Sequence, residues 1–155
     1  MKIAVFSDSH GRIHNCLCAL EEMGQVDHII HLGDSSQDAE DIGIVYGTVP
    51  ITYVCGNSDF CAGGAYEKMI ELCGIRLFLC HGHTLGVKNG LSDLARAAQS
   101  AHIALFGHTH EVFDGEEDGV RLFNPGSISL PASTAPSFGI LTIENGKIIT
   151  EHKFL

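Results

Sequence analysis

The feature that most constrains the fold of this chain is a recurring pattern of strand endings. Short apolar runs recur along the sequence, and each one stops at a polar or glycine-led cluster. The runs are IAVF, HIIHL, ITYVC, RLFLC and IALF, and the clusters that follow them are SDSHG, GDSS, GNSD, HGH and GHTH. A short apolar run that ends in this way is typical of a buried β-strand followed by its loop. The pattern therefore predicts buried strands whose loops carry polar side chains.

Helical patterns fill some of the intervals between these strands. Between Arg12 and Met23, apolar residues fall at helical spacing, and Gly24 follows at a position where helices commonly end. Residues 35–43 offer serine caps and early acidic residues that suit a short helix, and residues 91–98 repeat the helical pattern more weakly. Strands that alternate with helices predict an α/β fold with largely parallel strands at its centre.

The last third of the chain has a different pattern, which favours antiparallel strands. The segments HEVF and VRLF flank the acidic turn DGEEDG, and FGILTIE and KIITEHKF flank Asn145-Gly146, which is a strong hairpin signal. We therefore expect either two sheets or one mixed sheet, with helices over the faces. Because the chain has 155 residues and 45% apolar content, residues 1–155 are expected to form a single domain with a sizeable core.

The charge of the chain limits its partners. Nine Lys and Arg residues against nineteen Asp and Glu residues give a formal net charge of −10, so bulk nucleic-acid binding is not expected. No apolar stretch approaches the roughly 18 residues of a membrane span, and the start MKIAVFSDSHG lacks the apolar core of a signal peptide. The six cysteines form no CxxC pair, which is typical of small buried residues in a reducing compartment. We therefore expect a cytoplasmic protein without a membrane partner.

The polar clusters all follow the carboxyl ends of predicted strands. In α/β sheets these ends meet at one edge, where the loops carry the binding groups. The candidate side chains there are Asp8, His10, Asp34, Asn57, Asp59, His81, His83, His108 and His110. Oxygen and imidazole ligands suit manganese, iron, nickel or zinc better than calcium. The clusters together predict a metal site, although Asp34 alone also suits a helix cap and Asn57 alone suits a turn.

The number of candidate ligands indicates two metal ions. A single tetrahedral ion uses three or four ligands, whereas seven plausible ones are present here. Two divalent cations about 4 Å apart repel by roughly 17 kcal/mol at an effective dielectric constant near 20, so an anion must lie between them. Asp34, on a tight glycine-led loop, is the carboxylate best placed for this, and a hydroxide would be the second bridging anion.

The ordered motifs DSH, GD, GNSD, HGH, GHTH and NPGS resemble those of the calcineurin-like metallophosphoesterase superfamily. The match is best with its small phosphodiesterase branch of bacteria and archaea. The resemblance runs from Lys2 through the C-terminal strands. It implies a sandwich of two mixed β-sheets flanked by helices, which agrees with the α/β pattern described above.

The resemblance also implies which residues hold each metal ion. One ion is held by Asp8, His10, Asp34 and His110, and the other by Asp34, Asn57, His81 and His108. The expected cofactor is a pair of divalent transition-metal ions, with manganese first and nickel, iron, cobalt or zinc as alternatives. The implied reaction is the hydrolysis of a small phosphodiester or nucleotide-like substrate by a metal-activated hydroxide. Asp34 and Asn57 are therefore expected to be catalytic residues as well as ligands.

The sequence departs from the wider superfamily at two positions. Many relatives have GNHD or GNHE, in which the histidine is thought to protonate the leaving group, and Ser58 takes that position here. The candidates for the catalytic role are Asp59, by orienting a water, and His83, while Asn57, Ser58 and His83 are the expected substrate contacts. Relatives often carry a basic residue shortly after NPGS, whereas this chain has Ala132, so one phosphate contact is expected to be missing.

Two other functions are compatible with the same motifs. The first is a protein-binding scaffold on a phosphoesterase fold, as in the retromer subunit that resembles this family. The second is a metal-dependent regulator that binds a nucleotide without turnover. All seven ligand positions are filled, which favours an enzyme, and we expect it to cleave activated diesters better than simple alkyl monoesters.

Overall fold

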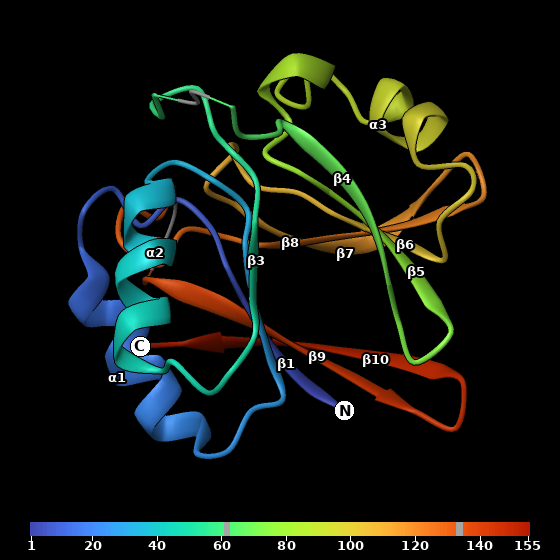
Figure 1. Cartoon of the computed structure of the whole chain (residues 1–155). Helices are drawn as coiled ribbons and strands as arrows, with labels where there is room; N and C mark the ends of the chain where they lie inside the picture. Colours follow the sequence, from blue (N-terminus) through green and yellow to red (C-terminus); the bar gives the residue numbers. More distant parts are fainter. Residues whose placement is uncertain (61–62, 133–134) are drawn as a thin grey trace.

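The computed structural model describes residues 1–60, 63–132 and 135–155, which form two five-stranded β-sheets that face one another (Figure 1). The first sheet has the strand order β10-β9-β1-β2-β3, and the second has the order β4-β5-β6-β8-β7. The strands of the first sheet are β1 (Lys2–Phe6), β2 (His28–His31), β3 (Ile51–Tyr53), β9 (Ser137–Glu144) and β10 (Lys147–Phe154). The strands of the second sheet are β4 (Glu67–Leu72), β5 (Ile75–Cys80), β6 (Ile103–Leu105), β7 (Val112–Glu117) and β8 (Val120–Pro125).

Both sheets are mixed. In the first sheet β1, β2 and β3 are parallel, while β9 is antiparallel to both β1 and β10. In the second sheet β5, β6 and β8 are parallel, and β4 and β7 pair antiparallel with them at the two edges. The predicted α/β sandwich of two mixed sheets is confirmed, and the alternative of one mixed sheet is wrong.

The main core lies between the two sheets. Alternate residues of a strand point to opposite faces, so Ile3 and Val5 of β1 face the second sheet. They are fully buried in one cluster with Leu77 of β5, Leu105 of β6 and Phe123 of β8. This packing fixes the carboxyl ends of the parallel strands relative to one another, and the candidate ligands follow those ends.

Helices cover the outer faces of the sheets. The helices α1 (Ile13–Met23) and α2 (Ser36–Val45) lie against the first sheet, where Ala4 and Phe6 pack with Cys16 and Leu20. The helix α3 (Ser92–Ala97) and the short 3₁₀ helix η1 (His83–Leu85) belong to the second-sheet side, where Leu94 packs in a buried cluster with Phe106 and Leu122. The predicted helix between Arg12 and Met23 is confirmed. It ends at Met23, and Gly24 follows it with a φ of 68°.

Two elements differ from the sequence-based expectations. The edge strand β4 was not expected, because its sequence EKMIEL mixes charged and apolar residues and only every second side chain is partly buried. The acidic segment DGEEDG is also not a single turn. Strand β7 continues to Glu117, and only Asp118 and Gly119, both with positive φ, make the turn.

The structure shows the state of several cysteines and the length of each described helix. Cys16 and Cys80 are buried free thiols, as expected. The expectation is wrong at Cys73, which is exposed, and at Cys55, which is disulfide-bonded. No helix among the described residues is long and apolar enough to cross a membrane. The cytoplasmic location stays a prediction.

Candidate metal centre

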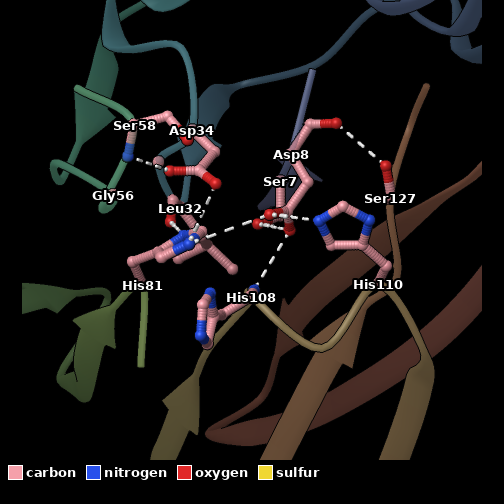
Figure 2. Close-up of polar contacts among 12 residues, drawn as sticks. Ser7, Asp8, Leu32, Asp34, Gly56, Ser58, His81, His108, His110 and Ser127 are labelled. Atoms are coloured by element: carbon pink, nitrogen blue, oxygen red, sulfur yellow. Dashed lines mark hydrogen bonds and ion pairs between the residues drawn. The ribbon is translucent and has the colours of Figure 1, made fainter. Parts of the chain in front are cut away.

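The candidate ligands gather where parallel strands of both sheets end. Asp8 and His10 follow β1, Asp34 follows β2, His81 follows β5, and His108 and His110 follow β6. Figure 2 shows Asp8, Asp34, His81 and His110 directed toward a common centre, with His108 beside it. Loops that are far apart in the sequence therefore meet at one place because the sheets bring their strand ends together.

Six of the seven predicted ligands form two groups. The ligand atoms of the first group lie within 4.8 Å of one another, and its members are Asp8, His10, Asp34 and His110. The same spacing defines the second group, whose members are Asp34, His81 and His108. Asp34 is shared by the two groups. Asn57 is exposed in the loop after β3, and its place in the second group stays a prediction.

Two histidine rings are oriented by hydrogen bonds to backbone carbonyl groups. His81 donates a hydrogen bond from Nδ1 to the Leu32 carbonyl oxygen at 2.8 Å, and His110 donates one from Nδ1 to the Leu130 carbonyl oxygen at 2.6 Å. In a neutral ring this leaves the lone pair on Nε2. The Nε2 atom of His110 lies 3.2 Å from Asp8 Oδ1, and that of His81 lies 3.5 Å from Asp34 Oδ2. Either a proton or a metal ion between such facing acceptors would stabilise them.

The buried polar atoms of the site fit a metal ion. Among the described residues, Asp8 Oδ1 and His81 Nε2 are fully buried and have no hydrogen-bond partner. Buried polar atoms without partners are rare, since each one costs about 1–3 kcal/mol. These two atoms lie 3.8 Å apart. An ion in each ligand group would give each of these atoms a partner, and the mixture of carboxylate oxygen and imidazole nitrogen suits a transition metal.

The pKa shifts show that protons compete for the same atoms. Burial lowers the pKa of His81, but Asp34 and Asp8 outweigh burial, so its pKa is raised overall. The nearby Asp8 carboxylate raises the pKa of His110. Burial raises the pKa of Asp34, but His81 and the Ser58 N–H group outweigh it, so the carboxyl is ionised well below neutral pH. Protons and a metal ion would therefore compete for the Nε2 atoms of the two histidines.

Five of the predicted ligands have an unusual backbone conformation. Positive φ angles, which L-residues other than glycine rarely adopt, occur at Asp8 (55°), His10 (48°), Asp34 (54°), His108 (69°) and His110 (60°). Hydrogen bonds between loops hold some of these residues in place, because the Asp8 N–H donates to the Gly33 carbonyl and the His10 N–H donates to the Asp34 carbonyl, each at 3.0 Å. Such strain is concentrated at functional sites.

The strain at His108 predicts a specific stability difference. In metal-free protein, His108→Gly should be more stable than His108→Ala by about 1 kcal/mol, because both remove the imidazole but only glycine adopts a φ of 69° without strain. The free energy of unfolding in urea measures this difference. His83, which has no positive φ, supplies the control pair, and there the glycine variant should be the less stable one by about 0.5–1 kcal/mol. Equal stability of the two His108 variants would contradict the argument.

The NPGS motif positions the ligand loops. Asn124 donates from Nδ2 to the Gly107 carbonyl at 3.1 Å and to Thr109 Oγ1 at 3.0 Å, so it holds the loop that carries His108 and His110. Ser127 and Ser129 donate from their hydroxyl groups to the Asp8 carbonyl at 2.9 and 2.8 Å. The NPGS turn and Ser129 therefore support both the GHTH loop and Asp8.

Asp59 binds backbone groups of two ligand loops. Its Oδ2 accepts hydrogen bonds from the N–H groups of Gly56 (2.7 Å) and Asp34 (3.1 Å), and its Oδ1 accepts from those of Ser35 (3.2 Å) and Ser36 (2.8 Å). The loops also touch directly, since a Cβ atom added to Gly56 would lie 2.1 Å from Asp34 Oδ1. Asp59 thus joins the GNSD loop to the Asp34 loop and to the start of α2. Its predicted catalytic role stays a prediction.

Ser58 and His83 lie beside the two ligand groups. The Ser58 N–H donates to Asp34 Oδ1 at 2.9 Å, and Ser58 lines a cavity of about 250 Å³ together with His10, Ser35 and Asp59. The His83 ring is partly buried, with centroid distances of 5.4 Å to His81 and 6.1 Å to His108. Burial and the charge of His81 lower the pKa of His83, so its ring is neutral near pH 7. Both residues adjoin the ligand groups, and their roles as substrate contacts stay predictions.

His31 is a positioning residue that the sequence pattern did not identify. It is fully buried at the end of β2. Its Nδ1 accepts a hydrogen bond from the Gly33 N–H at 3.2 Å, so Nε2 carries the proton and donates to Ser9 Oγ at 2.9 Å. His31 therefore links the DSH loop to the GD loop. The residue type alone carried no signal for this role.

This chain is similar in sequence and in fold to several known proteins. A probable metallophosphoesterase of Bacillus subtilis, YsnB, is 33% identical over 150 residues, which cover 94% of this chain and 86% of that protein. A phosphodiesterase of Methanocaldococcus jannaschii is 27% identical over 93% of this chain and 94% of its own length. The crystal structure of Vps29 of Entamoeba histolytica in complex with Zn²⁺ has the same fold, with a TM-score of 0.78, 21% identity and 99% coverage of both chains.

The family assignment rests on nearly the whole chain. The family model of the calcineurin-like phosphoesterase superfamily domain matches residues 1–146. That range includes both ligand groups and the NPGS turn, and the resemblance noted from the motifs is thereby confirmed. The ligand groups, the two-sheet fold and the matched family model agree, and the chain belongs to the calcineurin-like phosphoesterase superfamily.

Proposed function

We propose that this protein is a phosphodiesterase that uses two divalent metal ions. The observation that carries the proposal is the pair of ligand groups that share Asp34, in which buried acceptor atoms face one another without a partner in the described residues. One ion would be held by Asp8, His10, Asp34 and His110. The other would be held by Asp34, Asn57, His81 and His108. Manganese is the first choice of metal, with nickel, iron, cobalt and zinc as alternatives.

The charge of the site suits a phosphate ester even though the protein as a whole is acidic. Two divalent ions together with the two carboxylates Asp8 and Asp34 leave a positive centre, which attracts an anion within a chain of net charge −10. When bound, the two ions supply Lewis acidity and lower the pKa of water toward neutrality. A small phosphodiester or a nucleotide-like compound is the proposed substrate class.

The residues of this chain orient the ligands and contact the substrate. The Leu32 and Leu130 carbonyl groups fix the tautomers of His81 and His110 in their neutral form, which would leave their Nε2 atoms available to hold the ions. Asn57, Ser58 and His83 are the proposed substrate contacts. Because His83 is neutral near pH 7, it offers a hydrogen bond to the substrate but little acid to the leaving group. Diesters with good leaving groups should therefore be cleaved best.

Activity on an activated diester tests this function. Protein loaded with Mn²⁺ should hydrolyse bis(p-nitrophenyl) phosphate, and removal of the metal with EDTA should abolish the reaction because the ligand set then holds no cation. His108→Ala should lower kcat/KM by at least about 100-fold. His14→Ala, which changes an exposed histidine on α1, is the control and should keep the activity of the original protein.

A non-catalytic scaffold is the second candidate function. The similarity to Vps29 over nearly the full length of both chains favours it, since one fold can serve both roles. The two candidates differ in turnover. Absence of hydrolysis across Mn²⁺, Ni²⁺, Fe²⁺, Co²⁺ and Zn²⁺, in protein that binds these ions, would contradict the phosphodiesterase and leave the scaffold.

A further inference from the structure

The two carboxylate oxygens of Asp8 have different surroundings (Figure 2). Oδ2 accepts a hydrogen bond from the Ser7 hydroxyl group at 2.6 Å and one from the His108 N–H group at 3.1 Å. Among the described residues, Oδ1 has no hydrogen-bond partner, and it lies 3.2 Å from His110 Nε2 and 3.8 Å from His81 Nε2. The protein therefore occupies one oxygen of Asp8 and leaves the other one to the ligand groups.

Ser7 lies directly after β1 and holds Asp8 from within the protein. Its carbonyl oxygen accepts a hydrogen bond from the Ile128 N–H group at 3.2 Å, so its backbone is fixed at the end of the strand. The hydrogen bond from its hydroxyl group ends on a charged acceptor, and such bonds are shorter and stronger than those between neutral groups. Because Ser7 and Asp8 are both 0% exposed, bulk water does not compete for this contact.

Gly107 of the GHTH motif leaves the space for this hydrogen bond. A Cβ atom added to Gly107 would clash with Ser7 Oγ and would lie 2.9 Å from Asp8 Oδ2. The φ angle of Gly107 lies outside the left-handed region, so its backbone conformation does not require glycine. What the contact between Ser7 and Asp8 requires at this position is the absence of a side chain.

The hydrogen bond to Ser7 limits how the Asp8 carboxylate can turn. The terminal torsion of an aspartate has broad, roughly two-fold preferences, so a carboxylate that nothing holds can present either oxygen. Because the Ser7 hydroxyl group and the His108 N–H group hold Oδ2, Oδ1 is the oxygen that faces the neighbouring imidazole rings. Removing a group that orients a metal ligand commonly weakens metal binding by about 10- to 100-fold.

We propose that Ser7 is a positioning residue that directs Asp8 Oδ1 to the ion of the first ligand group, and that Gly107 leaves the room that this contact requires. The inference rests on the metal centre of the proposed function but does not depend on turnover. In this role Ser7 contacts neither the substrate nor an ion and acts only through Asp8. Since Asp8 belongs to one of the two ligand groups, loss of the hydroxyl group should affect one ion more than the other.

Removal of the Ser7 hydroxyl group tests the proposal. In Ser7→Ala, calorimetry should show that one Mn²⁺ ion binds about 10-fold more weakly, while the other binds within about threefold of its original affinity. The visible absorption spectrum of bound Co²⁺ should also change, because it depends on the number and geometry of the ligands.

Ser137→Ala is the matched control. Ser137 is also buried, and its hydroxyl group donates to the Pro125 carbonyl oxygen at 2.8 Å. Like Ser7→Ala, this variant loses a buried hydrogen bond, so both should lower the urea midpoint of the metal-free protein. Unlike Ser7→Ala, it should leave the Mn²⁺ affinities and the Co²⁺ spectrum as they are in the original protein.

A second variant places a methyl group against the Ser7 hydroxyl group. Gly107→Ala should weaken the binding of the same Mn²⁺ ion as Ser7→Ala does, because the methyl group displaces the hydroxyl group from Asp8. In the Ser7→Ala protein, Gly107→Ala should cost less affinity than it does in the original protein, because the clashing oxygen is gone. Fully additive losses would overturn the proposed role of the contact.

The results separate this inference from the proposed activity. If Ser7→Ala keeps both Mn²⁺ affinities and the Co²⁺ spectrum, or if Ser137→Ala weakens Mn²⁺ binding equally, the role of Ser7 is overturned while hydrolysis by the original protein can still be observed. If Ser7→Ala weakens one ion selectively but the original protein hydrolyses no diester, the role of Ser7 is supported and only the phosphodiesterase activity fails.

Discussion

Asp34→Asn is expected to lower kcat/KM for bis(p-nitrophenyl) phosphate by on the order of 1,000-fold. Asp34 is the residue that belongs to both ligand groups. Asparagine keeps the size of the side chain but removes the negative charge that separates two divalent ions. Their mutual repulsion, roughly 17 kcal/mol at 4 Å and an effective dielectric constant near 20, is then offset less well. The variant should therefore lose at least one of the two ions.

Metal content and kinetics together measure the effect of Asp34→Asn. The bound Mn²⁺ per chain should fall after desalting, and the rate should not recover when Mn²⁺ is added in modest excess. Asp118→Asn is the control, because it removes the same charge from an exposed turn residue between β7 and β8. An Asp34→Asn protein that keeps two ions and its original rate would contradict the shared role of Asp34.

Asp59→Asn is expected to destabilise the protein by about 2–3 kcal/mol and to weaken Mn²⁺ binding by about 10- to 100-fold. The carboxylate accepts hydrogen bonds from four backbone N–H groups of the two ligand loops. An asparagine side chain has one oxygen, so its NH₂ group would face N–H donors that it cannot satisfy. The loops would separate, and Asp34 would move with them.

The pattern of losses in Asp59→Asn distinguishes a positioning role from a catalytic one. A positioning residue affects the free energy of unfolding in urea, the Mn²⁺ affinity and the rate together. If Asp59 instead oriented a water for the chemical step, kcat would fall while stability and Mn²⁺ affinity stayed unchanged. That second outcome would contradict the positioning role and support the catalytic role predicted from the sequence.

Much of the fold was predictable because its signals are local. Each apolar run that ends in a polar cluster became a strand followed by a loop, and the Asn145-Gly146 hairpin joins β9 to β10. Strand β4 was missed because an edge strand needs little apolar content. Whether the strands form one sheet or two depends on pairing across long stretches of sequence, and for this the family resemblance carried more information than the pattern.

The sequence predicted the types of ligand but not the partners of each side chain. Asp34 and Asp59 follow glycine-led turns in similar ways, yet Asp34 lies in both ligand groups while the oxygens of Asp59 accept four backbone hydrogen bonds. The contacts of His31 likewise arise only when separate loops meet. The residue type determines which groups a side chain can bind. The packing of the loops determines which of its polar atoms already have a hydrogen-bond partner within the protein.

The central claim is that the two groups sharing Asp34 hold two ions, and anomalous X-ray diffraction from crystals soaked in Mn²⁺ tests it most directly. We expect two anomalous peaks about 3.5–4 Å apart, one among Asp8, His10, Asp34 and His110 and the other among Asp34, His81 and His108. A single peak, or peaks away from these side chains, would contradict the account.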